Sequence, residues 1–183
     1  MRLFVSVALD GLEDEIAAVQ EPLADAGGIR LTAPDQVHVT LKFLGDVDGS
    51  RVPDLTDALE AAVEETDVEP FTAEFGGLGA FPSDEYIRVV WVGVREGSDD
   101  LTRLHEAIER RTVELGFDPA DHAFTPHATV ARMDHAGGKE RVQRALRETD
   151  PTLGSREVDS IGLTESVLTD DGPEYTTVER VEL

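Results

Sequence analysis

The sequence predicts a mixed α and β fold in which a single domain, residues 1–183, consists of two similar lobes. A length of 183 residues with 40% hydrophobic side chains suits one compact domain better than two independent ones. Strand-like and helix-like periods alternate along the chain, with short polar turns between them. In addition, His38-Val39-Thr40-Leu41 resembles His127-Ala128-Thr129-Val130, half a chain away. Each of these segments lies on an expected strand ahead of an expected helix, which indicates two lobes related by a pseudo-twofold axis.

The first half of the chain is expected to form two strands and two helices. Residues 2–9 are a short apolar run, typical of a buried strand, and acidic residues follow them at once, which argues against a signal peptide. Leu55, Leu59 and Val63 fall on one helical face, as comparable apolar residues do in the preceding helix. In order, we expect a strand at 2–9, a helix at 13–26, a strand at 36–43 and a helix at 52–65.

The second half repeats this alternation. A strong apolar run around Trp91 predicts a strand, and Leu101, Leu104 and Ile108 are spaced for a helix. In order, we expect a strand near 70–75, a glycine-rich loop through 81–84, a strand at 86–94, a helix at 99–115, a strand at 127–132, a helix at 139–148, and strands near 156–168 and 175–182.

Charge is the strongest signal of the composition. Thirty-nine acidic residues face sixteen basic ones, the net charge is −23, and the acidic residues are spread over the whole chain. Self-repulsion of this size destabilises a compact state at low salt, whereas at about 1 M salt the Debye length is only about 3 Å. We therefore expect a halophilic protein in the cytoplasm of a salt-accumulating organism. No apolar run approaches the roughly 20 residues of a membrane span, so no membrane partner is expected.

The candidate catalytic residues are His38 and His127. Side chains alternate along a strand, so His38 shares a face with Thr40, and His127 shares a face with Thr129. If the two pairs faced each other, the hydroxyls could bind phosphate oxygens while one imidazole accepted a proton from water and the other donated one to the leaving oxygen. Histidine holds either protonation state near neutral pH, so such a site needs no metal.

Two other interpretations of the histidines compete with this one. A single His-x-Thr occurs often by chance, and a lone histidine on a strand is more often structural than catalytic. Histidine is also the commonest zinc ligand, but neither pair has a second ligand at i+2 or i+4. The chain has no cysteine, which excludes disulfides, thiolate zinc sites and a cysteine nucleophile. We therefore expect no metal and no organic cofactor.

Three neighbouring residues are candidates for contact with substrate. Lys42 has the same strand parity as His38 and Thr40, although a solvent-exposed lysine is an equally good interpretation. A guanidinium binds phosphate well, but strict alternation groups Arg132 with Val130, away from His127, unless the strand twists or ends there. Phe43 is most simply a core residue, as an aromatic side chain on the apolar face, yet at the rim of the site it could stack a base.

These motifs resemble those of the 2H phosphoesterase superfamily, and in particular of its LigT-like (ThpR-type) RNA 2′,3′-cyclic phosphodiesterases. The resemblance covers essentially the whole chain. It rests on 2–5, 38–45, 81–82, 88–94, 124–132, 163–168 and 172–175, with the paired His-x-Thr segments the most specific part. It implies a bilobal α+β fold in which two antiparallel sheets, with helices outside, line a central groove.

The resemblance also implies an activity. The enzyme would hydrolyse the 2′,3′-cyclic phosphate at the end of an RNA, such as a tRNA fragment, to a 2′-phosphomonoester. His38 would protonate the leaving 3′ oxygen, His127 would activate water, and Thr40 and Thr129 would bind the phosphate. Some relatives also run the reaction backwards as a 2′,5′ RNA ligation, and a monomer is the expected state.

Two rival functions remain open on the sequence alone. The first is a related phosphodiesterase that acts on 2′,5′-oligonucleotides or on small cyclic phosphates. The second is a non-catalytic module that binds nucleotides or RNA. The intact histidine pair argues against the second, because a binding module without chemistry needs no two histidines. A panel of substrates would distinguish the first from the expected activity. The strong negative charge makes binding along a long duplex unfavourable, because no basic stripe is visible.

Overall fold

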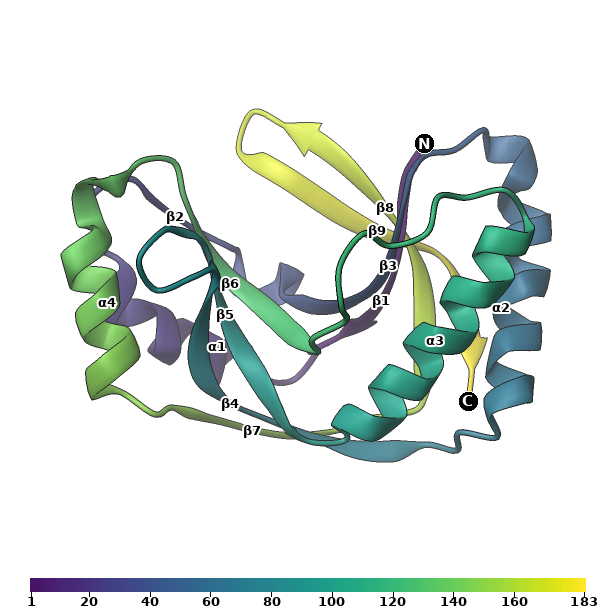
Figure 1. The fold of residues 1–183 in the computed structure, drawn as a ribbon, viewed down its shortest axis with the longest axis horizontal. Helices are drawn as coiled ribbons and strands as arrows, with labels where there is room; N and C mark the ends of the chain where they lie inside the picture. The colour runs from purple at the N-terminus through teal and green to yellow at the C-terminus, as the bar shows by residue number, and fades with distance from the viewer.

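The computed structural model describes all 183 residues, and Figure 1 shows its nine strands and four α-helices. In chain order these are β1 (Arg2–Ala8), α1 (Glu13–Gln20), β2 (Ile29–Leu31), β3 (His38–Asp46), α2 (Val52–Thr66), β4 (Phe71–Pro82), β5 (Ile87–Glu96), α3 (Ser98–Glu114), β6 (His127–Met133), α4 (Lys139–Glu148), β7 (Thr152–Val158), β8 (Ser160–Thr169) and β9 (Gly172–Glu182).

All strand pairs are antiparallel, and the strand order is β7-β4-β5-β6-β3-β1-β8-β9, with β2 added to β6. Strands β7, β4, β5 and β6, with β2, form the first lobe. Strands β3, β1, β8 and β9 form the second. Helices α1 and α4 lie with the first lobe, and α2 and α3 lie with the second (Figure 1). The predicted bilobal α+β architecture is therefore confirmed. The two expected sheets are joined into one curled sheet, because β3 and β6 pair at Val39 and Ala128.

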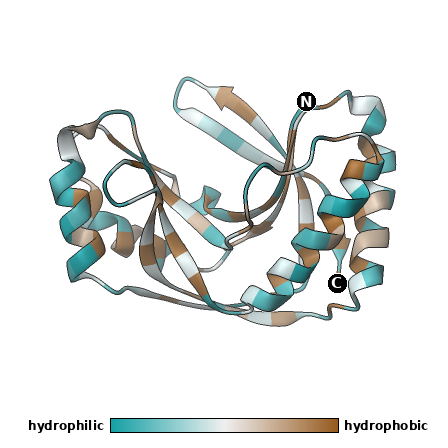
Figure 2. Ribbon diagram, viewed as in Figure 1, coloured by the Kyte–Doolittle hydropathy of each residue, from teal (hydrophilic) through white to brown (hydrophobic).

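The core explains why the helices form where they do. Leu55 and Leu59 of α2 and Leu104 and Ile108 of α3 are spaced by one turn and are fully buried. The apolar residues in Figure 2 lie mainly on the strands and on the helix sides that face them. A single cluster of 39 buried side chains runs through both lobes. None of the helices is long and apolar enough to cross a lipid bilayer.

Several predicted boundaries differ from the observed ones. The glycine-rich stretch before Ser83 is part of β4, not a loop, because it pairs with β5 along its length. A Cβ atom at Gly79 would lie 2.2 Å from the Trp91 ring, so glycine is needed where the indole crosses the neighbouring strand. The strand predicted at 156–168 is two strands, β7 and β8, which are separated at Asp159. The short strand β2 was not predicted, and α1 ends at Gln20, before a single 3₁₀ turn.

Candidate active site

The junction of β3 and β6 places both His-x-Thr segments on one face. Val39 lies opposite Ala128, and both side chains are fully buried on the core side. Extending this register by one residue in each direction sets His38 opposite Thr129 and Thr40 opposite His127. All four side chains are partly exposed on the other side of the strands. We call these four residues the two-histidine face.

His38 is held by its own strand and by two aromatic rings. Its Nδ1 lies 2.9 Å from the Gln36 carbonyl oxygen, and its Nε2 lies 3.0 Å from the Thr40 hydroxyl. The Phe4 and Tyr175 ring centroids are each 4.9 Å from the imidazole centroid, and the Tyr175 ring is edge-on at 84°. These contacts fix both the position and the tilt of the imidazole.

His127 has a closely similar environment. Its Nδ1 lies 2.6 Å from the Thr125 carbonyl oxygen, two residues before it, as Gln36 is before His38. Phe81 packs edge-on at 4.9 Å and Trp91 lies at 5.9 Å, measured between ring centroids. The two lobes thus hold their histidines in the same way, with different aromatic residues.

The backbone contacts determine which ring nitrogen carries the proton. A carbonyl oxygen can only accept a hydrogen bond, so Nδ1 of His38 and Nδ1 of His127 must both donate. In each neutral imidazole Nε2 is therefore the basic nitrogen. On His38 it accepts a hydrogen bond from the Thr40 hydroxyl. Once Nε2 of His38 is protonated it can no longer accept, and the hydroxyl is free to turn to another acceptor.

Both imidazoles favour the neutral form. Burial lowers the pKa of His38 below its ordinary value, the Gln36 carbonyl opposes this, and the charges of Arg132 and His127 lower it further. Burial likewise lowers the pKa of His127. The hydrogen bond to the Thr125 carbonyl raises this pKa, and the positive charge of Arg132 lowers it again. A negatively charged ligand on this face would oppose these positive charges and favour the protonated forms.

A β-bulge in β3 corrects the expected position of Lys42. Ser6 pairs with Thr40 and Val5 with Lys42, so Leu41 is the extra residue and the alternation reverses after it. Lys42 therefore points into the second lobe, where it is only 5% exposed. Its ammonium donates to Glu109 Oε2 and to the Asp118 carbonyl oxygen, each at 2.7 Å. It is committed to these partners and does not reach the two-histidine face.

The same bulge moves Phe43 out of the core. Phe43 is 70% exposed, so its interpretation as a core residue is wrong, and its ring lies 6.2 Å from that of Phe4, which packs on His38. A second bulge occurs in β6, where Thr129 pairs with Trp91 and Ala131 with Val90. It turns Arg132 to the exposed side that His127 occupies, so strict alternation was the wrong rule here too. Phe43 and Arg132 hold equivalent places, each five residues after its histidine.

The aromatic residues around the histidines were not identified as site residues from the sequence. Tyr175 is 139 positions from Gln36, yet its N–H donates to the Gln36 side-chain oxygen at 2.7 Å. That contact ties β9 to the residue whose carbonyl orients His38. Trp91, in the strand predicted at 86–94, is half-buried beside His127. The only sequence signal was that these aromatics lie in the segments resembling the 2H phosphoesterases.

The other histidines serve different purposes. His105 stacks on Phe124 at 4.1 Å, and its Nδ1 lies 2.7 Å from the Leu41 carbonyl oxygen, so it ties α3 to the bulge of β3. His122 is exposed and pairs with Asp121 at 2.6 Å. No three histidine, aspartate or glutamate side chains gather in a way that could hold a metal ion.

Taken together, the two-histidine face and the neighbouring Arg132 offer two basic imidazole Nε2 atoms, two hydroxyls and one guanidinium. Such a set can accept a proton at one point, donate one at another and hold a tetrahedral anion between them. Transfer of a phosphoryl group needs proton acceptance, proton donation and anion binding in the same step.

Comparisons with known proteins agree with this chemistry. A profile of the 2′-5′ RNA ligase superfamily matches residues 9–168. The RNA 2′,3′-cyclic phosphodiesterase of Aeropyrum pernix is 38% identical over 91% of this chain and 93% of its own length. That of Methanothermobacter thermautotrophicus is 34% identical over 98% of this chain and 97% of its own length.

Solved structures show the same fold. The crystal structure of TT0787 from Thermus thermophilus superimposes with a TM-score of 0.82 at 27% identity, and covers 100% of this chain and 98% of that one. The structure of Escherichia coli LigT complexed with 3′-AMP superimposes with a TM-score of 0.80 at 23% identity, and covers 100% of this chain and 97% of that one. The resemblance seen in the sequence is thus confirmed: this chain belongs to the 2′-5′ RNA ligase superfamily of 2H phosphoesterases.

Proposed function

We propose that this protein is an enzyme that hydrolyses the 2′,3′-cyclic phosphate at the end of an RNA to a 2′-phosphomonoester. The observation that carries the proposal is the pair of oriented imidazoles on one face: each Nδ1 is bonded to a backbone carbonyl, so each Nε2 is the basic nitrogen, and Thr40 and Thr129 lie on the same face. The relatives from Aeropyrum pernix and Methanothermobacter thermautotrophicus bear the name of this activity.

In the proposed reaction the two histidines hold opposite protonation states. Neutral His127 accepts a proton from water through Nε2 as the water oxygen bonds to phosphorus. Protonated His38 donates its Nε2 proton to the 3′ oxygen as the bond from phosphorus to that oxygen breaks. The proton count is unchanged, and the phosphate remains on the 2′ oxygen. The lowered pKa of His38 makes its protonated form a stronger acid than an ordinary imidazolium.

Thr40, Thr129 and Arg132 would bind the phosphate. Protonation of His38 releases the Thr40 hydroxyl, so the acid form of the site is also the form that can donate to a phosphate oxygen. The Arg132 guanidinium takes part in no ion pair and acts electrostatically on both histidines. Phe43, exposed on the opposite lobe at the equivalent position, offers a surface on which a terminal base could stack.

A 2′,5′ RNA ligation on the same face is also part of the proposal. A ribose 5′-hydroxyl in the place of water would attack the cyclic phosphate and leave a 2′,5′ linkage. His127 would then accept the proton of that hydroxyl, and the other roles would be unchanged. Fragments of tRNA with cyclic phosphate ends are the expected substrates for both reactions.

We further propose that the two lobes fold as a single domain, because one strand order runs through both of them. The charge of −23 favours a cytoplasm of high salt concentration, and a monomer is the expected state.

A substrate panel tests the proposed function. An oligonucleotide with a 2′,3′-cyclic phosphate end, a 2′,5′-linked oligonucleotide and ADP-ribose 1″,2″-cyclic phosphate are incubated separately in molar KCl, and the products are separated by chromatography. We expect the first to give a 2′-phosphate with the highest kcat/KM. Turnover of only one of the other two, or no turnover at all, would contradict the proposal. Addition of EDTA should leave the rate unchanged, and inhibition by EDTA would favour a metal-dependent reaction.

A further inference from the structure

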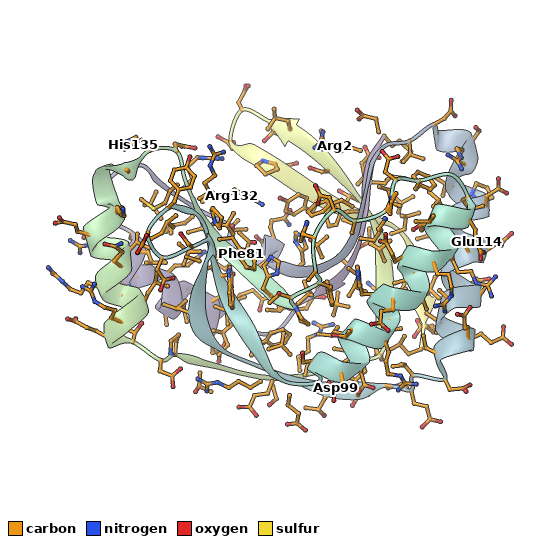
Figure 3. The ribbon with its side chains drawn as sticks, in the orientation of Figure 1. Arg2, Phe81, Asp99, Glu114, Arg132 and His135 are labelled. Carbon is orange, nitrogen blue, oxygen red and sulfur yellow. The ribbon has the colours of Figure 1, made fainter.

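A pocket of about 480 Å³ adjoins the two-histidine face through Arg132. It lies in the first lobe, between the start of β5, the end of β6, β2 and the segment that leads into α4. Its size falls within the usual range of small-ligand sites. Figure 3 shows Arg132 between Phe81, near the middle of the molecule, and His135, at the outer end of the same lobe. The pocket thus leads outward from the proposed reaction centre.

The pocket is basic in a strongly acidic protein. Arg30, Arg88, Arg132 and Lys139 line it, against Glu85 and Asp134. The whole chain, by contrast, has 39 acidic and 16 basic residues. Positive charge is therefore concentrated next to the site, where a polyanion would need it.

These cations differ in how free they are. Both side-chain oxygens of Asp134 accept from Arg30 Nε at 2.9 Å, so Arg30 is neutralised. Arg132 and Lys139 form no ion pair. Arg88 donates to the Tyr86 hydroxyl at 2.8 Å and lies over that ring, 5.3 Å from its centroid, without an acidic partner. Three cations and one aromatic ring that is 57% exposed are thus available to a ligand.

The other accessible element near His38 is unsuitable for an anion. The hairpin of β8 and β9 brings Tyr175 to His38, but its turn and the start of β9 carry Asp170, Asp171 and Glu174. A nucleic acid strand would meet like charge there. A second cavity, of about 250 Å³, lies on α2 and α3, and its Arg103 and Arg110 are engaged by the Thr66 carbonyl and the Glu65 carboxylate.

An RNA that ends in a cyclic phosphate can continue from the site only in its 5′ direction. We propose that the pocket binds the nucleotide preceding the terminal one, a proposal that rests on the proposed function. Lys139 and Arg88 hold the phosphodiester that joins the last two nucleotides, and the Tyr86–Arg88 pair stacks the preceding base. Phosphate contacts by lysine and arginine, with stacking on tyrosine, are the usual means of binding single-stranded RNA. The pocket therefore makes the enzyme prefer an oligonucleotide to a mononucleotide.

Two substrates that differ by one nucleotide test this preference. Adenosine 2′,3′-cyclic phosphate reaches only the two-histidine face, whereas ApA with a 2′,3′-cyclic phosphate end also reaches the pocket. In the Arg88→Gln/Lys139→Gln variant we expect kcat/KM for the dinucleotide to fall about tenfold, mainly through KM, with the mononucleotide unaffected. Equal losses on the two substrates, or no loss on the dinucleotide, would overturn the proposal.

The matched control is Arg144→Gln/Arg147→Gln. It removes two positive charges from exposed, unpaired arginines of α4 that do not line the pocket. This variant should retain wild-type kcat/KM on both substrates. An equal fall in the control would mean that net charge, not the pocket, determines dinucleotide binding.

Binding of the products separates failure of the pocket from failure of the proposed reaction. Titration calorimetry compares 2′-AMP with ApA carrying a terminal 2′-phosphate, and needs no turnover. Tighter binding of the dinucleotide to the wild type, lost in Arg88→Gln/Lys139→Gln, supports the pocket even if neither cyclic phosphate is hydrolysed. Equal affinities in the wild type would overturn the pocket, even if both cyclic phosphates were hydrolysed.

Discussion

At the scale of single residues, the protonation of His38 and His127 determines how the site works. Both Nδ1 atoms donate to backbone carbonyls, and burial lowers both pKa values. The proposed reaction needs one protonated and one neutral imidazole. The pH dependence of kcat/KM reports the pKa values of the free enzyme. Because both histidine pKa values are lowered, the pH of highest kcat/KM should be lowered as well.

A pH profile tests this. We expect a bell-shaped dependence of kcat/KM with its maximum below about pH 6.5, the ordinary pKa of histidine. Each limb of the profile should report the titration of one imidazole. The measurement is kcat/KM from pH 4.5 to 8.5 at constant ionic strength. A maximum above pH 7, or a flat profile through pH 5–8, would contradict paired acid–base catalysis.

The same pKa shifts predict how stability depends on pH. In the unfolded chain both histidines have a pKa near 6.5, and in the folded protein both pKa values are lower. At a pH between the folded and unfolded pKa values, the unfolded state therefore binds more protons. The contribution of neutral His38 and His127 is therefore complete above about pH 6.5 and is lost as the pH falls toward the folded pKa values. Urea unfolding at pH 7.5 and 5.5 measures it. The His38→Asn/His127→Asn variant should lose less stability over this interval than the wild type, and an equal or larger loss would refute the assignment.

At the scale of elements, the two bulges organise the site. Alternation correctly predicted that His38 and Thr40, and likewise His127 and Thr129, share a face. It failed two residues later on both strands, because an extra residue at Leu41 and another at Val130 reverse it. A bulge depends on how the neighbouring strands pair, and the sequence of one strand does not contain that information.

The residues after the bulges show the consequence. Lys42 was expected beside His38 and is buried against Glu109, while Arg132 was expected on the far face and is exposed on the near one. Glu109 also accepts from the Ala120 N–H at 2.7 Å. Lys42 therefore fastens the segment before β6 to α3 and β3. Desolvation alone would raise the pKa of Glu109, but Lys42 and the Ala120 N–H bring it below its ordinary value.

This ion pair gives a prediction for stability. Replacing Lys42 with Met leaves the Glu109 carboxylate without its main partner in a largely buried position. We expect the free energy of unfolding to fall by about 3 kcal/mol, as for other broken buried pairs. Urea unfolding measures the loss. The Lys42→Met/Glu109→Leu double variant should recover much of it, because no charge is left buried without a partner. An unaffected single variant would show that Lys42 is not a structural cation.

At the scale of the whole molecule, the sequence predicted the bilobal α+β fold from two short repeats and the alternation of strands and helices. The repeats lie on β3 and β6, the strands at which the lobes meet. It did not predict that Tyr175 and Trp91 would surround the histidines, since β9 reaches His38 only through the pairing of four strands. Long-range strand pairing has no local signature, whereas the periodicity of a helix such as α4 does.

The net charge of −23 also acts on the whole molecule and predicts a dependence on salt. Raising KCl from about 0.1 M to about 1 M shortens the Debye length from about 10 Å to about 3 Å and removes most of the repulsion between acidic side chains. We expect the urea midpoint and the specific activity both to rise. Sucrose of equal osmolality stabilises compact states without screening charge, and serves as the control. Equal effects of sucrose and KCl, or none of KCl, would argue against adaptation to a salt-rich cytoplasm.

Catalysis by the two histidines is tested most directly by the hydrolysis of an oligonucleotide 2′,3′-cyclic phosphate by the wild type, His38→Ala and His127→Ala. We expect a 2′-phosphate product from the wild type and a loss of at least about 10²-fold in kcat for each variant, since each removes one general acid or base. Unchanged thermal unfolding of the variants would show that the fold is intact. Wild-type turnover in either variant, or a 3′-phosphate product, would contradict acid–base catalysis by His38 and His127.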